Sequence, residues 1–254
     1  MKTIAIVNQK GGVAKTTTAL ALGHGLAVRG KKVLLIDFDP QGSLTTFLGF
    51  DTSNIPTAFE WLGVQKKHVA KFEDVVLHVK DNLDVIPSDI SLEEAPGFLY
   101  SKPGGHGYLL NVISEIKSRY DYVIIDTSPS LNILTINALV AADELIVPFK
   151  PEVGSVKGIS LLLDTIADVR ALNREIKIAG FLIVMADKRR KATLKENVEY
   201  ITGVAVQSKT KVYDSYIRAS ASAARLTKED IFTPGTSASN DYSAFVEEFL
   251  QGDI

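Results

Sequence analysis

A short segment near the N-terminus combines two lysines, two glycines and a hydroxyl at fixed spacing. It reads Lys10-Gly11-Gly12, followed after two further residues by Lys15-Thr16. Glycines allow backbone N–H groups to turn toward an anion, and lysine ammonium groups neutralise phosphate oxygens. A threonine hydroxyl directly after such a lysine is a suitable ligand for Mg²⁺. The segment therefore predicts a site for a phosphate chain with its magnesium ion.

The flanking residues indicate which elements hold this segment. A β-rich apolar run over residues 3–7 precedes it, and a pattern of small residues over 17–28 predicts a helix after it. A strand, a glycine-bearing loop and a helix start form a phosphate cradle, because the helix N-terminus adds partial positive charge. The alternative is a glycine-rich turn between a strand and a helix with incidental lysines.

Two further apolar runs end in carboxylates. Residues 33–36 lead into Asp37 and Asp39, and residues 122–125 lead into Asp126. Continuous apolar runs are typical of strands covered on both faces in a parallel sheet, and ligands bind at the carboxyl ends of such strands. We therefore expect these acids to lie near the phosphates. The alternative for each is an ordinary turn at the end of a strand.

The glycine-bearing segment departs from the common pattern G-x-x-x-x-G-K-[ST], because Gln9 and Ala14 occupy the two glycine positions. With its additional lysine it resembles the deviant Walker A motif of the ParA/MinD family of dimeric ATPases. Residues 37–43 resemble the first switch segment of that family. Residues 126–131 resemble the second, with Ser128 where relatives often have proline.

The resemblance implies ATP and Mg²⁺ as cofactors and a role for each matching residue. Lys10, Lys15 and Asp39 would be catalytic: Lys10 reaches the nucleotide of a partner subunit, and Asp39 orients the attacking water. Thr16, Asp126 and Asp39 would lie at the metal, with Asp37 close by. The phosphate-binding residues implied are Lys10, Gly11, Gly12, Val13, Ala14, Lys15, Thr16 and Thr17.

Positive charge is densest in the second half of the chain. A basic run comprises Lys188, Arg189, Arg190 and Lys191, and Arg218 could extend it. Charge alone leaves two alternatives open: a solvated loop, or salt-sensitive contact with DNA backbone. The resemblance favours DNA contact, because ParA ATPases bind non-specific DNA through basic residues in this half. A Pro-Glu pair that includes Glu152 lies near the dimer interface in relatives, although a solvated charge is equally consistent.

Composition bounds the class of protein. The 254 residues are 46% hydrophobic, with a net charge of −2 and no cysteine, which excludes disulfides and cysteine-ligated clusters. No apolar run reaches membrane-spanning length, so we expect a cytoplasmic protein. The resemblance implies that it associates with the nucleoid when it binds ATP. The fold class expected is α/β: one ParA-type domain over residues 1–254, with a mostly parallel seven- to eight-stranded sheet and helices on both faces.

Three functions fit these features. The first is a positioning ATPase whose ATP-bound homodimer binds non-specific DNA, while an adaptor protein stimulates hydrolysis and release. Its cargo would be a plasmid, a chromosome origin or a protein organelle such as a carboxysome. The second is a MinD-like membrane ATPase, but the polar face of the predicted helix over 237–250 has no Lys or Arg to contact lipid. The third is a biosynthetic ATP-dependent ligase, which leaves the basic run and Lys10 unexplained.

Overall fold

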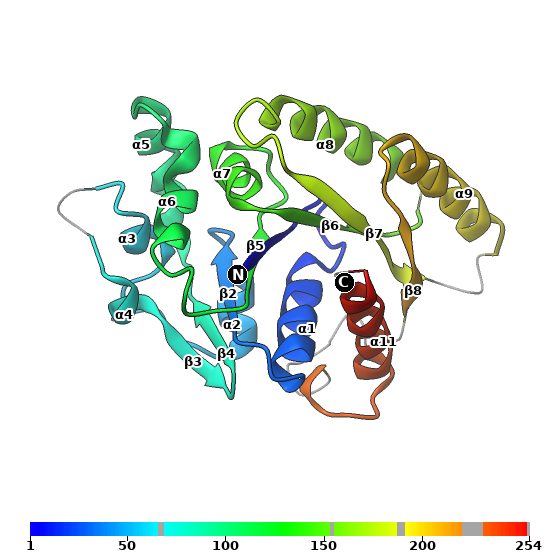
Figure 1. Ribbon diagram of the computed structural model, residues 1–254, viewed down its shortest axis with the longest axis horizontal. Helices are drawn as coiled ribbons and strands as arrows, with labels where there is room; N and C mark the ends of the chain where they lie inside the picture. Colours follow the sequence, from blue (N-terminus) through cyan, green and yellow to red (C-terminus); the bar gives the residue numbers. More distant parts are fainter. Residues whose placement is uncertain (66–68, 153–154, 187–190, 220–230, 253–254) are drawn as a thin grey trace.

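The computed structural model describes residues 1–65, 69–152, 155–186, 191–219 and 231–252. These residues form one α/β domain built on an eight-stranded sheet with the strand order β3-β4-β2-β5-β1-β6-β7-β8 (Figure 1). All neighbouring strands are parallel except the pair β3 and β4. The predicted fold class is therefore confirmed. The strands are β1 (Lys2–Ile6), β2 (Val33–Phe38), β3 (Leu77–Lys80), β4 (Leu83–Ile86), β5 (Tyr122–Thr127), β6 (Glu144–Phe149), β7 (Lys177–Ala186) and β8 (Val212–Arg218).

Helices cover both faces of the sheet (Figure 1). One hydrophobic core lies under α1, α2 and α11, and a second lies under α3, α5, α6, α7, α8 and α9. The helices are α1 (Lys15–Val28), α2 (Ser43–Leu48), α3 (Ala58–Leu62), α4 (Phe72–Val75), α5 (Ala95–Ser101), α6 (Tyr108–Ser114), α7 (Ile133–Ala141), α8 (Ser155–Val169), α9 (Lys191–Gln207) and α11 (Ser237–Gln251), with 3₁₀ turns η1 (Ile90–Glu94) and η2 (Gly105–Gly107).

Strand β1 lies at the centre of the sheet and explains where a ligand can bind. Its side chains alternate between the two cores: Ile4 and Ile6 face the α1 side, whereas Ala5 and Val7 face the α7 side. The connection from β1 to β2 runs through α1 on one face, and that from β5 to β6 runs through α7 on the other. The chain therefore leaves the middle of the sheet in opposite directions. Such a switch point leaves a crevice at the carboxyl ends of the strands.

The local structure differs from the sequence-based expectation in three places. The apolar spacing of residues 108–120 predicts one helix, but α6 ends at Ser114 and the chain continues as turns. Strand β3 was not predicted, because its partly exposed residues lack the apolar run of a central strand. Helix α2 was not predicted either, since its six residues directly follow a segment rich in turn-forming residues.

The C-terminal helix α11 packs against the sheet as predicted, with Phe245 and Phe249 buried. It also binds the outermost strand β8 through its carboxylates. Glu248 accepts hydrogen bonds from the backbone N–H groups of Asp214 and Ser215, at 2.9 and 2.8 Å. Asp241 accepts one from the backbone N–H of Arg218, at 3.0 Å. Across the ranges that the structure describes, no helix is long and apolar enough to cross a membrane.

Candidate nucleotide-binding site

The loop after β1 adopts a strained conformation that exposes the start of α1. Gly12 has φ of 69°, and Ala14, the residue before α1, has φ of 58° and ψ of 33°. A left-handed conformation is natural for glycine but costs an alanine roughly 1 kcal/mol. No side chain caps the N-terminus of α1. Its first N–H groups and the positive end of its dipole are therefore free to bind an anion.

Asn8 fixes the beginning of this loop. Its side-chain amide donates to the carbonyl of Pro148 at 2.7 Å, and its Oδ1 accepts the backbone N–H of Lys10 at 2.9 Å. Asn8 therefore ties the loop to the end of β6, across 140 residues of sequence. Sequence alone gives no signal for this role, because an asparagine after a strand is also typical of an ordinary turn.

Lys15 is buried at the start of α1, with only 8% of its surface exposed. Its Nζ donates to the carbonyl of Lys10 at 3.4 Å, which is a long bond. Burial lowers the pKa of Lys15, and the negative charges of Asp126 and Asp39 raise it in part. A buried ammonium with weak partners favours the approach of an anion such as phosphate.

Asp126 and Asp37 end neighbouring strands and lie opposite each other in the register of β2 and β5. Both are fully buried, and among the described residues neither oxygen of Asp126 makes a hydrogen bond of ordinary geometry, although the Thr16 hydroxyl lies close by. Burial raises the pKa of Asp126, the charge of Asp37 raises it further, and the Thr16 hydroxyl and Lys15 partly offset this. An unsatisfied buried carboxylate is costly unless a cation or a donor reaches it.

This donor set fits Mg²⁺. Asp126 and the hydroxyl of Thr16 are oxygen ligands, which Mg²⁺ prefers, and the ion usually takes its other ligands from water and substrate phosphates. In the described part of the chain, no three His, Cys, Asp or Glu side chains gather around one point as a metal cluster. A divalent ion here would therefore be bound jointly by the protein and a phosphate chain.

Asp39 lies in the first switch segment and is only partly exposed. Its Oδ1 accepts the backbone N–H of Gln41 at 3.0 Å, which keeps residues 39–42 in a tight turn. A cleft that contains Asp39 and Gln41 on one side has Ser128 and Ser130 on the other. The structure thus brings the first and second switch segments, both expected from the sequence, to the same cleft.

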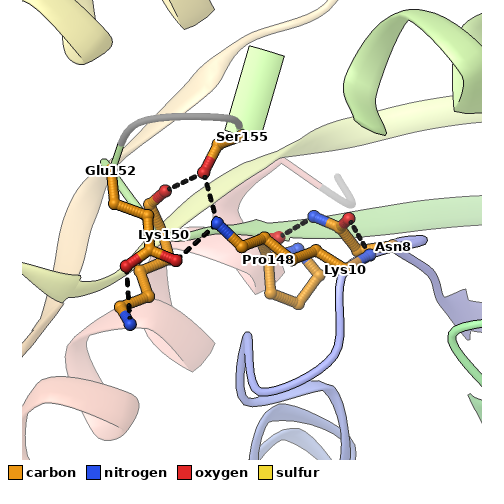
Figure 2. A network of polar contacts seen from close by, with 6 residues as sticks. All are labelled: Asn8, Lys10, Pro148, Lys150, Glu152 and Ser155. Atoms are coloured by element: carbon orange, nitrogen blue, oxygen red, sulfur yellow. Dashed lines mark hydrogen bonds and ion pairs between the residues drawn. The ribbon is translucent and has the colours of Figure 1, made fainter. Parts of the chain in front are cut away.

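The side chain of Lys10 is held by residues just after β6 and at the start of α8 (Figure 2). Its Nζ forms an ion pair with Glu152 and donates to the hydroxyl of Ser155 at 3.3 Å. Glu152 also pairs with Lys150 at 2.7 Å, and Ser155 donates to the carbonyl of Lys150 at the same distance. Glu152 is therefore a partner of Lys10 in this conformation rather than a solvated charge.

A second polar network surrounds Asp37. Its Oδ2 accepts the backbone N–H of Thr45 at 2.8 Å and the hydroxyl of Thr45 at 2.7 Å. The same hydroxyl accepts the backbone N–H of Ser88 at 2.9 Å. Burial raises the pKa of Asp37 to about 6, although the two Thr45 bonds oppose this shift. Thr45 lies in the unpredicted helix α2, so no sequence signal identified it.

The structure describes only some of the predicted DNA-binding residues. Lys188, Arg189 and Arg190 lie outside the described residues, as does the side chain of Lys191 at the start of α9. Arg218 is described, and its guanidinium pairs with Asp241 at 2.8 Å. Its charge is therefore largely balanced within the chain.

The chain matches a protein-family model and is similar in sequence to known proteins. A family model described as an AAA domain matches residues 1–178. The sporulation initiation inhibitor protein Soj of Bacillus subtilis is 39% identical over 217 residues, which cover 85% of this chain and 83% of that protein. The chromosome partitioning protein ParA of Caulobacter vibrioides is 39% identical over 221 residues, 85% of this chain and 80% of that protein.

Solved structures resemble this fold over nearly its whole length. Cobyrinic acid a,c-diamide synthase from Mycobacterium smegmatis, with a bound ATP analogue and magnesium, has a TM-score of 0.84 at 30% identity, covering 99% of this chain and 95% of that one. McdA of Cyanothece, in its apo form, also has a TM-score of 0.84, at 27% identity, covering 98% of this chain and 99% of that one. The phosphate loop, the two acids at neighbouring strand ends and the relatives agree: this chain belongs to the ParA family of P-loop NTPases.

Proposed function

We propose that this protein is an ATP-dependent positioning ATPase. The observation that carries the proposal is the pairing of an uncapped helix start with a buried lysine and an unpartnered buried carboxylate, Lys15 and Asp126. An anion satisfies the first two features and a divalent cation satisfies the third. A magnesium–nucleoside triphosphate supplies both. The chromosome partitioning relative supports the movement of a cargo as the purpose, and the structural neighbour with a bound ATP analogue and magnesium supports ATP as the nucleotide.

The residues would divide the chemistry as follows. Backbone groups of residues 10–17 hold the phosphates, and Lys15 neutralises charge that develops during phosphoryl transfer. Thr16 and Asp126 hold Mg²⁺, which supplies further charge neutralisation when it is bound. Asp39, partly exposed in the cleft between the switch segments, orients the attacking water.

Dimerisation would change the environment of Lys10. In the single chain its ammonium is bound to Glu152 and Ser155. To reach the nucleotide of a partner subunit, Lys10 must leave both, and Glu152 keeps Lys150 as a counter-ion when this happens. An ATP-bound homodimer therefore exchanges one internal ion pair for a contact between subunits and the phosphates.

The remaining parts of the proposal concern partners. Non-specific DNA would bind the ATP dimer through the basic run at 188–191, and an adaptor protein would stimulate hydrolysis and release. The likeness to cobyrinic acid a,c-diamide synthase favours one alternative, a biosynthetic ATP-dependent enzyme. That alternative predicts nucleotide turnover with no dependence on DNA or on an adaptor.

The deciding experiment measures binding of a random-sequence duplex DNA with ATP, with ADP and without nucleotide, at two salt concentrations. The positioning ATPase binds DNA only with ATP, and more weakly at high salt, because phosphate contacts release counter-ions. A variant with Lys188, Arg189 and Arg190 changed to Ala should lose this binding while it keeps ATP affinity. DNA binding that is absent under every condition would contradict the proposal and favour the biosynthetic alternative.

A further inference from the structure

The hydroxyl of Thr45 connects two loops at the carboxyl edge of the sheet. It donates to Asp37 at the end of β2 and accepts from the backbone N–H of Ser88, just after β4. Thr45 is almost completely buried, with 2% of its surface exposed. Because the Ser88 N–H occupies an acceptor position of this oxygen, the hydroxyl proton is directed at the Asp37 carboxylate.

Close packing keeps Thr45 in this position. Gly42, the residue before α2, has φ of 58°, and a Cβ there would lie 2.7 Å from the carbonyl oxygen of Ser88. The start of α2 therefore lies directly against the loop after β4, with no room for a side chain. This contact sets the distance between Thr45 and its two partners.

The two oxygens of Asp37 are consequently not equivalent. Oδ2 accepts two short bonds from Thr45, at 2.7 and 2.8 Å. Among the described residues, Oδ1 accepts only the backbone N–H of Asp39, at 3.4 Å, which is a weak bond. Asp37 lies beside Asp126 in the sheet register, so its less satisfied oxygen belongs to the same buried acidic region as the metal-binding acid.

We propose that Thr45 is a positioning residue for Mg²⁺ binding, acting through Asp37. By holding Oδ2, Thr45 leaves Oδ1 available to the water shell of a Mg²⁺ that Thr16 and Asp126 bind. The inference rests on the proposed nucleotide site and adds to it a residue that does not itself contact ligand. Outer residues of this kind orient the groups around a metal and affect its affinity.

The test measures ATP affinity with Mg²⁺ and with EDTA, using a fluorescent ATP analogue and the full-length chain. The dissociation constant in EDTA divided by that with Mg²⁺ is a ratio that reports the contribution of the metal and does not depend on turnover. Thr45→Val keeps the side-chain shape and the backbone bond but removes the hydroxyl. We expect this ratio to fall about 10-fold, while affinity in EDTA is unchanged. Thr45→Ser, which restores the hydroxyl, should restore the ratio.

A double-mutant cycle with Asp37→Asn separates positioning from a general structural effect. If Thr45 acts through Asp37, then Thr45→Val lowers the ratio in the wild-type background and has no further effect in the Asp37→Asn background. Equal losses in both backgrounds overturn the inference. Thr46→Val, an exposed neighbour in α2, is the matched control and should behave as wild type.

Two outcomes distinguish this inference from the proposed function. Mg²⁺-dependent ATP binding that is unaffected by Thr45→Val overturns the role of Thr45 alone. Wild-type protein without Mg²⁺-dependent ATP binding overturns the nucleotide site and, with it, the inference. Thermal unfolding without nucleotide reports whether each variant folds. If Thr45→Val does not fold, Thr45→Ala replaces it in the test, because its smaller side chain admits water to the Ser88 N–H. Thr45→Ala should show the same loss in the ratio.

Discussion

The two ends of helix α1 differ in how their free backbone N–H and C=O groups are satisfied. At its C-terminal end the N–H groups of Gly30 and Lys31 donate to the carbonyls of Ala27 and Leu26, at 2.9 and 3.2 Å. Gly30 has φ of 79°, the left-handed conformation that such a helix end requires. This end is therefore satisfied by the chain itself.

At the N-terminal end the chain supplies no such partners. An alanine, Ala14, takes the left-handed conformation, and no side chain caps the helix. Lys15 is buried beside Asp126, whose oxygens lack hydrogen-bond partners. One end of the helix is therefore satisfied by the chain, whereas the other leaves N–H groups that an anion could bind. Four predictions test this contrast, from the largest expected effect to the smallest.

Lys15→Ala should weaken ATP binding about 100-fold, because it removes a buried charge-assisted bond to phosphate. Equilibrium binding of a fluorescent ATP analogue measures the loss. Lys31→Ala, at the opposite and exposed end of α1, is the matched control and should leave affinity unchanged. Near-normal affinity in the Lys15 variant would remove the phosphate role assigned to residues 10–17.

Asp39→Ala should retain ATP binding and dimerisation but lower the hydrolysis rate at saturating ATP by about 100-fold, as expected for the loss of a water-orienting group. Phosphate release and size-exclusion chromatography with light scattering report the two properties separately. Asp51→Ala changes an exposed acid outside the site and should turn over ATP normally. Wild-type turnover in the Asp39 variant would exclude this residue from the reaction.

Asp126→Asn should stabilise the nucleotide-free protein by about 2 kcal/mol at neutral pH, because the burial of the carboxylate and the charge of Asp37 together outweigh the attraction of Lys15. The same change should abolish the stabilisation that Mg²⁺ with ATP gives to the wild type. Urea unfolding with and without ligand measures both effects. Asp121→Asn is a useful control, because Asp121 lies just before β5 and its carboxylate already accepts the Lys32 N–H at 2.8 Å. That variant should lose stability rather than gain it.

His24, in the C-terminal half of α1, should make the protein sensitive to acid. Burial, followed by the charges of Lys80 and Arg29, lowers the pKa of His24 from 6.5 to about 4. Between these pH values the unfolded chain binds a proton that the native state does not. The contribution of His24 to the free energy of unfolding should therefore fall as the pH drops from 6.5 to 4, by on the order of 2 kcal/mol after a discount for the partial exposure of its side chain. The raised pKa of Asp37 contributes in the opposite direction over the same range. His24→Gln should remove this part of the pH dependence, and an unchanged pH profile would contradict it.

Much of the fold and of the phosphate site could be predicted from sequence because it depends on local patterns. Apolar runs of strand length fix β1, β2 and β5, and the acids that follow them must meet at one edge of a parallel sheet. The register that sets Asp37 opposite Asp126 follows from the same rule. The loop lysines and glycines needed only their spacing and flanking elements.

The parts that sequence did not reveal depend on contacts between distant residues. Ser155 holds Lys10 from 145 positions away, and Ser88 binds Thr45 from 43 positions away. Serine and threonine occur throughout ordinary turns and helices, so their type alone gives no signal. Only the packing of one loop against another assigns them a role.

The bonds between α11 and β8 have a consequence for how copies of this protein can meet. An outer strand offers free backbone groups to any second chain, which is a common origin of unwanted aggregation. Here three backbone N–H groups of β8 are already bound by Glu248 and Asp241. Helix α11 therefore protects this edge of the sheet from pairing with a strand of a second copy.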